Sequence, residues 1–325
     1  VLRRTAREVR RADDDATRDA LWRGRLLAAP ALTSGGRTVY FGDVTVPREH
    51  LPALGRTVRE VAARYGLVIV NVGHIGDGNV HPTVIYDPID PAQYAAARAA
   101  DDEIVSAALA LGGTLTGEHG VGSAKRHQMT KRFSPAEIAA MRAVKRAFDP
   151  AGILNPGILL PDPSPEEPLL PRFSATVQAS VDAARAGRPG SDGTAASLHY
   201  VGDTNVVLDA ANLTVTAQPS VSLDVLADEL ASHGFQTTLP SSDATLEYAI
   251  VQAPARAAIR DALLAVRARV AEVNAAAPAT YDVRFGSNAV KDVAGYDLKR
   301  LFIGSRGVLG QVEEAILRVT PIQQS

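Results

Sequence analysis

Two glycine-framed segments carry the residues of this chain that are best suited to metal chemistry. Residues 73–81 read GHIGDGNVH and residues 117–122 read GEHGVG. They hold His74, His81, Glu118 and His119 together with six glycines. Imidazole nitrogens and carboxylate oxygens are common ligands of zinc and similar divalent ions, and glycine lets the backbone approach a bound group closely. The two segments therefore predict chemistry at a metal ion.

The spacing suggests how the ligands could meet. Residues 76–79 (Gly-Asp-Gly-Asn) are typical of a tight turn, so a strand, a turn and a second strand would place His74 and His81 side by side. Glu118 would add a third ligand and leave positions open, as a catalytic zinc requires. His119 could then serve as a general base. Spacing alone leaves the alternative open that these histidines, like Asp77, are structural turn residues.

Composition narrows the class of protein. The chain has 325 residues, which is enough for about two domains, and 46% of them are hydrophobic. A net charge of -2 without a long basic run argues against nucleic acid as a partner. The absence of cysteine excludes disulfides and thiolate-bound metal centres within this chain, and it is compatible with a cytoplasmic location. No apolar run reaches the length of a transmembrane helix.

A proline-rich segment divides the chain. Residues 160–171 contain five prolines, which disfavour both helix and sheet. We therefore expect domains at 1–160 and 173–325 joined by a linker at 161–172; the alternative is a long surface loop within one domain. The chain begins with Val1 rather than methionine, so we expect a fragment or a processed product.

Hydrophobic periodicity predicts a layered α+β arrangement in the first half, with helices packed on one sheet. Gly66 suits a helix end, and Ser134 with Glu137 forms a capping box. The expected helices are 4–27, 48–65, 91–111 and 134–148, and the expected strands are 38–46, 67–72 (buried), 80–86 and 114–116.

The second half also mixes both kinds of element, and its pattern does not repeat that of the first half. The expected strands are 198–208, 213–218, 282–285 and two strands within 308–319 on either side of Gly310; the expected helices are 223–233 and 253–274.

The motifs of the first half resemble a known family. GHIGDGNVHP at 73–82, GEHGVGSAK at 117–125 and AFDPAGILNPG at 147–157 are similar to the C-terminal domain of FAD-linked oxidases. This family includes glycolate oxidase D subunits, D-lactate dehydrogenases and D-2-hydroxyglutarate dehydrogenases. The resemblance runs from about residue 21 to residue 160. It implies a ferredoxin-like cap domain that acts on 2-hydroxy acids.

The resemblance also implies roles for individual residues. His74, His81 and Glu118 would bind the divalent metal, zinc or similar, and His119 would be the base. Arg25, in a Leu-Trp-x-x-Arg stretch, would bind the substrate carboxylate. Asn155 would lie near the flavin.

Three positions depart from the family pattern. Some relatives have a threonine where this chain has Ala29 and a lysine where it has Phe41, and the motif Asn-Pro-Gly-Lys ends here in Ile158. The departures at Ala29 and Phe41 disfavour 2-hydroxyglutarate and favour smaller acids such as glycolate or lactate.

The second half resembles part of a PCMH-type FAD-binding domain of the same superfamily, closest to the glycolate oxidase E subunit. The resemblance depends on residues 288–298 and 302–310, where glycine turns flank apolar runs. The glycine-rich pyrophosphate loop is at best degenerate at 187–193, and residues 241–254, where a second glycine-rich stretch is expected, contain no glycine. We therefore expect a partial domain. The cofactor contacts that the resemblance implies are Lys291, Gly295, Tyr296, Asp297, Gly304, Gly307 and Gly310.

Two functional hypotheses follow from the resemblance. In the first, the chain is part of an FAD-dependent 2-hydroxy-acid dehydrogenase, a fused D–E polypeptide whose flavin domain lies upstream. In the second, it is a non-catalytic subunit or interaction module. Either way we expect other glycolate oxidase-type subunits as partners, including an iron–sulfur subunit, and a location in the cytoplasm or on the inner face of the membrane.

Overall fold

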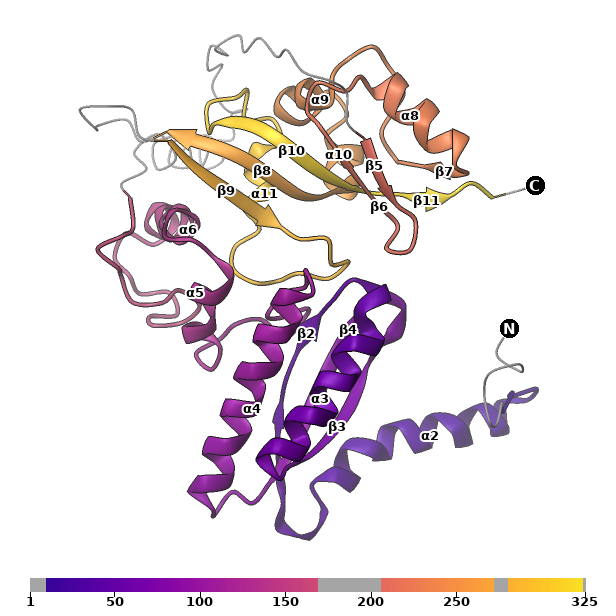
Figure 1. The fold of residues 1–325 in the computed structure, drawn as a ribbon, viewed down its shortest axis with the longest axis vertical. Coiled ribbons are helices and arrows are strands. Elements are labelled where there is room, and N and C mark those ends of the chain that lie inside the picture. The colour runs from indigo at the N-terminus through magenta and orange to yellow at the C-terminus, as the bar shows by residue number, and fades with distance from the viewer. Residues whose placement is uncertain (1–9, 169–205, 272–279, 324–325) are drawn as a thin grey trace.

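The structure is a computed structural model that describes residues 10–168, 206–271 and 280–323. It contains two larger antiparallel sheets, one in each half of the chain (Figure 1). The N-terminal sheet carries two long helices on one face. The second sheet lies beside it and is built from the residues after 205.

Strand β4 (Asn79–Tyr86) is the centre of the first sheet. It pairs with β1 (Thr38–Phe41) on one side and with β3 (Val68–His74) on the other, and its first residues pair with β2 (Val44–Thr45). The predicted strands at 38–46 and 80–86 are thus confirmed. The first of them is interrupted at Gly42 and Asp43, which are buried.

Helices α3 (Leu51–Tyr65) and α4 (Pro91–Ala110) cover one face of this sheet. The layered arrangement predicted for the first half is therefore confirmed, as is the end of α3 at the left-handed Gly66. The other face is open, because the side chains of Val68 and Val72 are about half exposed. The prediction that β3 is buried is wrong, since only one face of an antiparallel sheet needs a cover.

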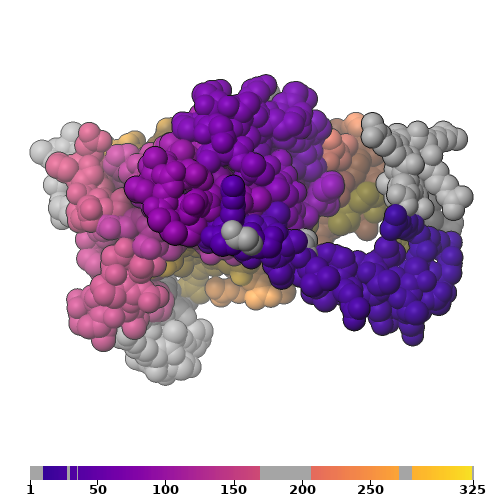
Figure 2. All heavy atoms as spheres, turned by 90° about the horizontal axis from the view of Figure 1, so that it is seen from below, coloured from indigo at the N-terminus to yellow at the C-terminus, as the bar shows by residue number. Residues whose placement is uncertain are grey.

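Of the helix predicted at 4–27, residues 4–9 lie outside the described part. The described helix α2 (Asp15–Leu32) begins where the Asp14 side chain accepts from the Thr17 N–H and caps it. Its described side chains from Asp15 to Ala31 are exposed, and the helix projects from the body of the molecule (Figures 1 and 2). Among the described residues, no helix combines the length and apolarity needed to cross a membrane.

The capping box of α6 (Pro135–Phe148) forms as predicted, with Ser134 and Glu137 bonded in both directions. Before α6 comes the single turn α5 (Met129–Arg132). The strand predicted at 114–116 is reduced to one bridge between Thr45 and Thr114.

The second sheet has the strand order β5-β6-β10-β8-β9, and all neighbours are antiparallel. The strands predicted at 213–218 and 282–285 and the helix at 223–233 are confirmed; of the strand predicted at 198–208, residues before 206 lie outside the described part. The elements are β5 (Val206–Asp209), β6 (Thr214–Ala217), α8 (Leu223–Ser232), β7 (Phe235–Gln236), α9 (Leu246–Gln252), α10 (Arg256–Ala262), β8 (Leu263–Ala271), β9 (Thr280–Gly286), α11 (Lys299–Phe302), β10 (Gln311–Arg318) and β11 (Thr320–Pro321).

Two predictions in this half are wrong. Up to residue 271, the helix predicted at 253–274 is the short α10 followed by β8, where buried Val266 and Ala268 alternate with Arg267 and Arg269; residues 272–274 lie outside the described part. A period of two is typical of a strand, and tertiary pairing with β9 and β10 decides it here. The two strands predicted around Gly310 are one strand, β10, which begins after the glycine.

The two halves share one hydrophobic core. Between them, Arg132 donates to the Gly286 carbonyl at 2.6 Å, and the Arg284 N–H donates to Glu137 at 2.5 Å. The described part of the proline-rich segment lies against α6, because Glu167 accepts two hydrogen bonds from Arg142. The predicted domain boundaries at 160 and 173 remain predictions.

Gly295 offers a test of this shared core. Its φ is +78°, and an added Cβ would lie 2.6 Å from the Met141 sulfur of α6. Gly307 has a φ of +77° but nothing within 4 Å. We expect Gly295→Ala to lower the free energy of unfolding by about 2–4 kcal/mol, as backbone strain and overpacking add, and Gly307→Ala to cost only the strain. Urea unfolding measures both, and equal losses would contradict the packing role of Gly295.

Candidate functional site

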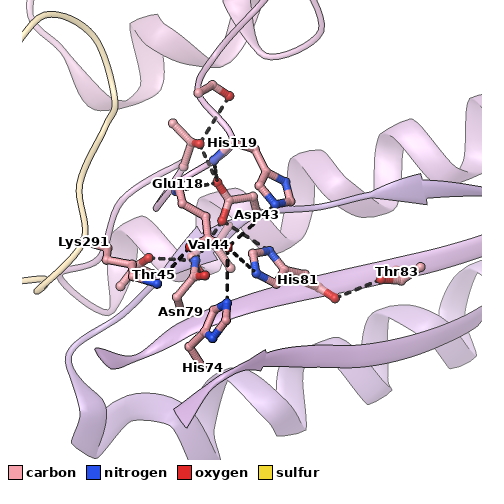
Figure 3. A network of polar contacts seen from close by, with 12 residues as sticks. Asp43, Val44, Thr45, His74, Asn79, His81, Thr83, Glu118, His119 and Lys291 are labelled. Carbon is pink, nitrogen blue, oxygen red and sulfur yellow. Dashed lines mark hydrogen bonds and ion pairs between the residues drawn. The ribbon is translucent and has the colours of Figure 1, made fainter. Parts of the chain in front are cut away.

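The two histidines and the glutamate predicted to bind a metal converge at one end of the first sheet. His74 is the last residue of β3 and His81 lies in β4, joined by a short turn at Ile75–Asp77. Glu118 comes from the loop after α4, and its Oε1 lies 3.3 Å from His74 Nε2 and 3.0 Å from His81 Nε2 (Figure 3). Ligand atoms of a tetrahedral zinc site are roughly 3.3 Å apart, given bonds of about 2.0 Å. The two separations from Glu118 match this spacing, and the three donor atoms lie within 4.8 Å of one another, as an ion bound by all three would require.

The electrostatics of these groups also suit a cation. Burial lowers the pKa of His81, which favours the neutral imidazole that a metal requires. The hydrogen bond from Lys291 lowers the pKa of Glu118, which favours the carboxylate. At neutral pH both side chains are thus in the protonation state of a metal ligand.

Asp43 is the residue beneath the site that sequence reasoning missed. Its buried carboxylate accepts from the Thr116 hydroxyl at 2.6 Å, from the N–H groups of Glu118 and His119 at 3.0 and 2.8 Å, and from the Asn79 amide at 2.7 Å. Burial by itself would raise its pKa, but these hydrogen bonds outweigh burial and lower the pKa to about 2. Asp43 is therefore ionised and holds the loop that carries Glu118.

Asp43 also faces His81, one of the three predicted ligands. Its Oδ1 lies 3.4 Å from His81 Nδ1, while Nε2 of the same ring points at Glu118. A carboxylate behind a ligating imidazole commonly orients the ring. Asp43, His81 and His119 form a second group of donors within ligand distance of one another, but the oxygens of Asp43 already accept four hydrogen bonds. We therefore interpret Asp43 as a residue that supports the predicted ligands and not as a ligand itself. The sequence feature that could have revealed Asp43 is a Gly-Asp pair that interrupts an apolar strand.

Lys125 is a second missed residue. It is buried, and its Nζ donates to the carbonyls of Asp43 and Leu115, both at 2.7 Å. Burial lowers the pKa of this lysine. The side chain ties the break after β1 to the segment before Glu118, so it helps to hold the two sides of the site together. Its position at the end of the GEHGVGSAK motif is the signal that could have revealed it.

His119 lies next to the three donors. Its ring stacks on that of His81, with centroids 4.5 Å apart and an interplanar angle of 3°, and its backbone N–H is held by Asp43. The His119 side chain is 46% exposed, and its Nε2 lies 3.9 Å from Glu118 Oε1. The ring is thus close to the donors and open to solvent.

The structure does not bring Arg25 to this site. Arg25 lies on the projecting helix α2 with its guanidinium 5.2 Å from the centre of the Trp22 ring. In the part of the chain that the structure describes, no hydrogen bond or ion pair joins Arg25 to the histidines.

The predicted cofactor residues are dispersed. Asn155 and Tyr296, from different halves, line the same pocket of about 440 Å³ beside α6. Lys291 instead lies at the histidine site. Asp297 pairs with Lys299 at 2.6 Å and with Arg300 at 2.8 Å.

The glycines of the second half have structural explanations. Gly295 packs on Met141, and a Cβ on Gly310 would lie 2.4 Å from the Arg269 carbonyl. Gly304 and Gly307 adopt left-handed backbone angles in the turns before β10. Because protein atoms fill the space at Gly295 and Gly310, these two described glycines do not offer a flavin pyrophosphate cradle, and the degenerate loop predicted at 187–193 lies outside the described residues.

Comparison with known proteins places the first half in a family. Residues 2–159 match the model of the C-terminal domain of FAD linked oxidases. This half of the chain belongs to that family, which confirms the resemblance. The fusion to an E subunit-like domain is not tested by these matches.

Individual relatives match the same half. Glycolate oxidase subunit GlcD of Escherichia coli K12 is 39% identical over 161 residues, which are 50% of this chain and 32% of that protein. GlcD of Bacillus subtilis is 39% identical over 46% of this chain and 32% of its own length. A probable mitochondrial D-lactate dehydrogenase of Danio rerio is 35% identical over 46% of this chain and 30% of its own length. The chain thus spans about a third of the length of these relatives.

Proposed function

We propose that this chain is part of an FAD-dependent dehydrogenase that oxidises a small 2-hydroxy acid to the 2-oxo acid by hydride transfer to FAD. The observation that carries the proposal is the convergence of His74, His81 and Glu118 with His119 beside them. The relatives, named glycolate oxidase subunits and D-lactate dehydrogenases, support the class of substrate. We further propose that it works with other subunits of such a complex, an iron–sulfur subunit among them, in the cytoplasm or on the inner face of the membrane.

The residues of this chain have distinct tasks in the proposal. A divalent ion held by His74, His81 and Glu118 would polarise the substrate hydroxyl and make its proton easier to remove. His119 receives that proton, since its half-exposed ring adjoins the three donors. Asp43 keeps the His81 ring and the Glu118 loop in place.

Two parts of the substrate site depend on more than the described residues. The family resemblance implies that Arg25 binds the substrate carboxylate. This role requires α2 to pack over the site in the complete protein. The flavin would accept the hydride. Because the described glycines Gly295 and Gly310 of the second half do not offer a cradle for its pyrophosphate, we assign flavin binding to sequence that the relatives have beyond the matched third, or to a partner chain.

The second candidate function is that of a non-catalytic subunit. The packing of Gly295 and Gly310 against protein atoms favours it for the second half alone. In this alternative, residues 206–323 serve to dock partner subunits and contribute nothing to turnover.

Removing the metal from the complete protein or complex distinguishes the metal-dependent dehydrogenase from the non-catalytic subunit. We expect glycolate or D-lactate oxidation to fall at least ~100-fold after chelation and desalting, because the polarising ion is lost, and to return when zinc or manganese is added. The FAD absorption spectrum, recorded before and after chelation, controls for loss of flavin. Turnover that survives complete metal removal would exclude the proposed mechanism.

A further inference from the structure

A lysine from the second half reaches the candidate metal site of the first half. Lys291 Nζ lies 2.8 Å from Glu118 Oε2 (Figure 3). It also lies 3.0 Å from Asp77 Oδ2. Asp77 belongs to the turn between the two histidines. One ammonium group thus joins the turn, the glutamate loop and the second half of the chain.

The loop that carries Lys291 is anchored on both sides of this residue. The Thr114 hydroxyl donates to Asp292 at 2.9 Å, and the Val293 N–H donates to the Thr116 carbonyl at 3.2 Å. Ala289 and Ala294 are buried. Lys291 therefore approaches Glu118 from a backbone that is held against the same segment that leads to Glu118.

The two oxygens of Glu118 face different partners. Oε1 faces the Nε2 atoms of His74 and His81, whereas Oε2 accepts a hydrogen bond from Lys291. A carboxylate with one oxygen engaged by an ammonium group has only the other available to an ion. It is also restrained from rotating, because a charge-assisted hydrogen bond holds it.

We propose that Lys291 is a positioning residue of the metal site: it restricts Glu118 to binding through Oε1 alone and so leaves the remaining coordination positions to substrate. The inference rests on the proposed function, because it assumes the ion at His74, His81 and Glu118. It gives the second half a part in the chemistry of the first half.

Replacing zinc with cobalt tests whether Glu118 binds through one oxygen or two. The visible absorption of Co²⁺ weakens as its coordination number rises above four. We expect the purified 325-residue chain to give an intense Co²⁺ spectrum. In Lys291→Met the freed Oε2 also binds, so the absorption falls about threefold as the site moves from four towards five or six ligands. Lys291→Arg should keep the intense spectrum.

Lys299→Met is the matched control. Lys299 lies on the same stretch of the second half, is less exposed than Lys291, and pairs with Asp297 rather than with the site. We expect it to leave the cobalt spectrum unchanged. Circular dichroism and thermal unfolding show whether each variant is folded. Lys291 borders a pocket of about 460 Å³, so methionine can be accommodated there.

The outcomes separate this inference from the proposed function. If the wild-type chain binds no Co²⁺, the metal site itself is wrong and the proposed function falls with it. If the wild-type chain binds Co²⁺ and folded Lys291→Met gives the same spectrum, the positioning role is wrong while the metal site stands.

Discussion

Glu118→Gln should weaken zinc binding by at least ~100-fold, more than the 10–100-fold typical of residues that merely support a ligand. Glu118 supplies the only carboxylate oxygen that faces both His74 and His81 among the described residues. An amide oxygen is neutral and a poorer zinc ligand than a carboxylate. Competition with a chromophoric chelator measures the affinity of the purified chain.

Glu103→Gln is the control for this substitution. Its side chain is 34% exposed, as is that of Glu118, and it pairs with Arg64 far from the histidines. Zinc affinity should stay within about twofold of the wild type, because no ligand or supporting residue changes. Equal affinity of the Glu118 and Glu103 variants would show that the three donors do not hold the ion.

Asp43→Asn should be the most destabilising change at the site. The substitution keeps the shape of the side chain but turns one acceptor oxygen into a donor. At the Oδ1 position that donor faces the Asn79 amide; at the Oδ2 position it faces the Thr116 hydroxyl and two backbone N–H groups. We expect a loss of about 3–5 kcal/mol in the free energy of unfolding, since a buried charge network loses its centre. Urea unfolding at neutral pH measures it.

The same variant has an expected pH dependence. The pKa of Asp43 in the folded chain is about 2, below the ordinary aspartate value of 3.8. Ionised Asp43 therefore stabilises the fold above pH ~4, and this contribution, about 2 kcal/mol, is lost as the pH falls from about 4 to about 2. The stability difference between the wild type and Asp43→Asn should be constant from pH 5 to 7 and shrink below pH 4.

Asp162→Asn serves as the control for Asp43. Asp162 pairs with Arg126, but its side chain is 90% exposed. Exposed ion pairs contribute at most about 1 kcal/mol, so this variant should unfold nearly as the wild type does at every pH. A loss at Asp43 no larger than at Asp162 would mean that the buried network does not hold the loop.

The sequence predicted the local parts of this molecule well. The turn that brings His74 next to His81 is encoded by adjacent glycine and polar residues, and the capping box of α6 by Ser134 and Glu137. Such features depend on neighbours within a few positions. The failures at residues 253–274 and at β3 have the opposite cause. Pairing with β9 and β10 decides the first, and the exposure of one face of β3, seen at Val68 and Val72, decides the second.

The sequence by itself determined which residues could bind an ion, because histidine and carboxylate chemistry is a property of the side chains. Only the tertiary structure decided how those residues are supported. Asp43, Lys125 and Lys291 lie 75, 7 and 173 positions from Glu118 along the chain, yet all three hold its segment or its carboxylate. The contacts of Asp43 and Lys291 with the Glu118 segment join distant positions and arise when strands pair and the two halves pack, so the local sequence can mark such residues but not their contacts.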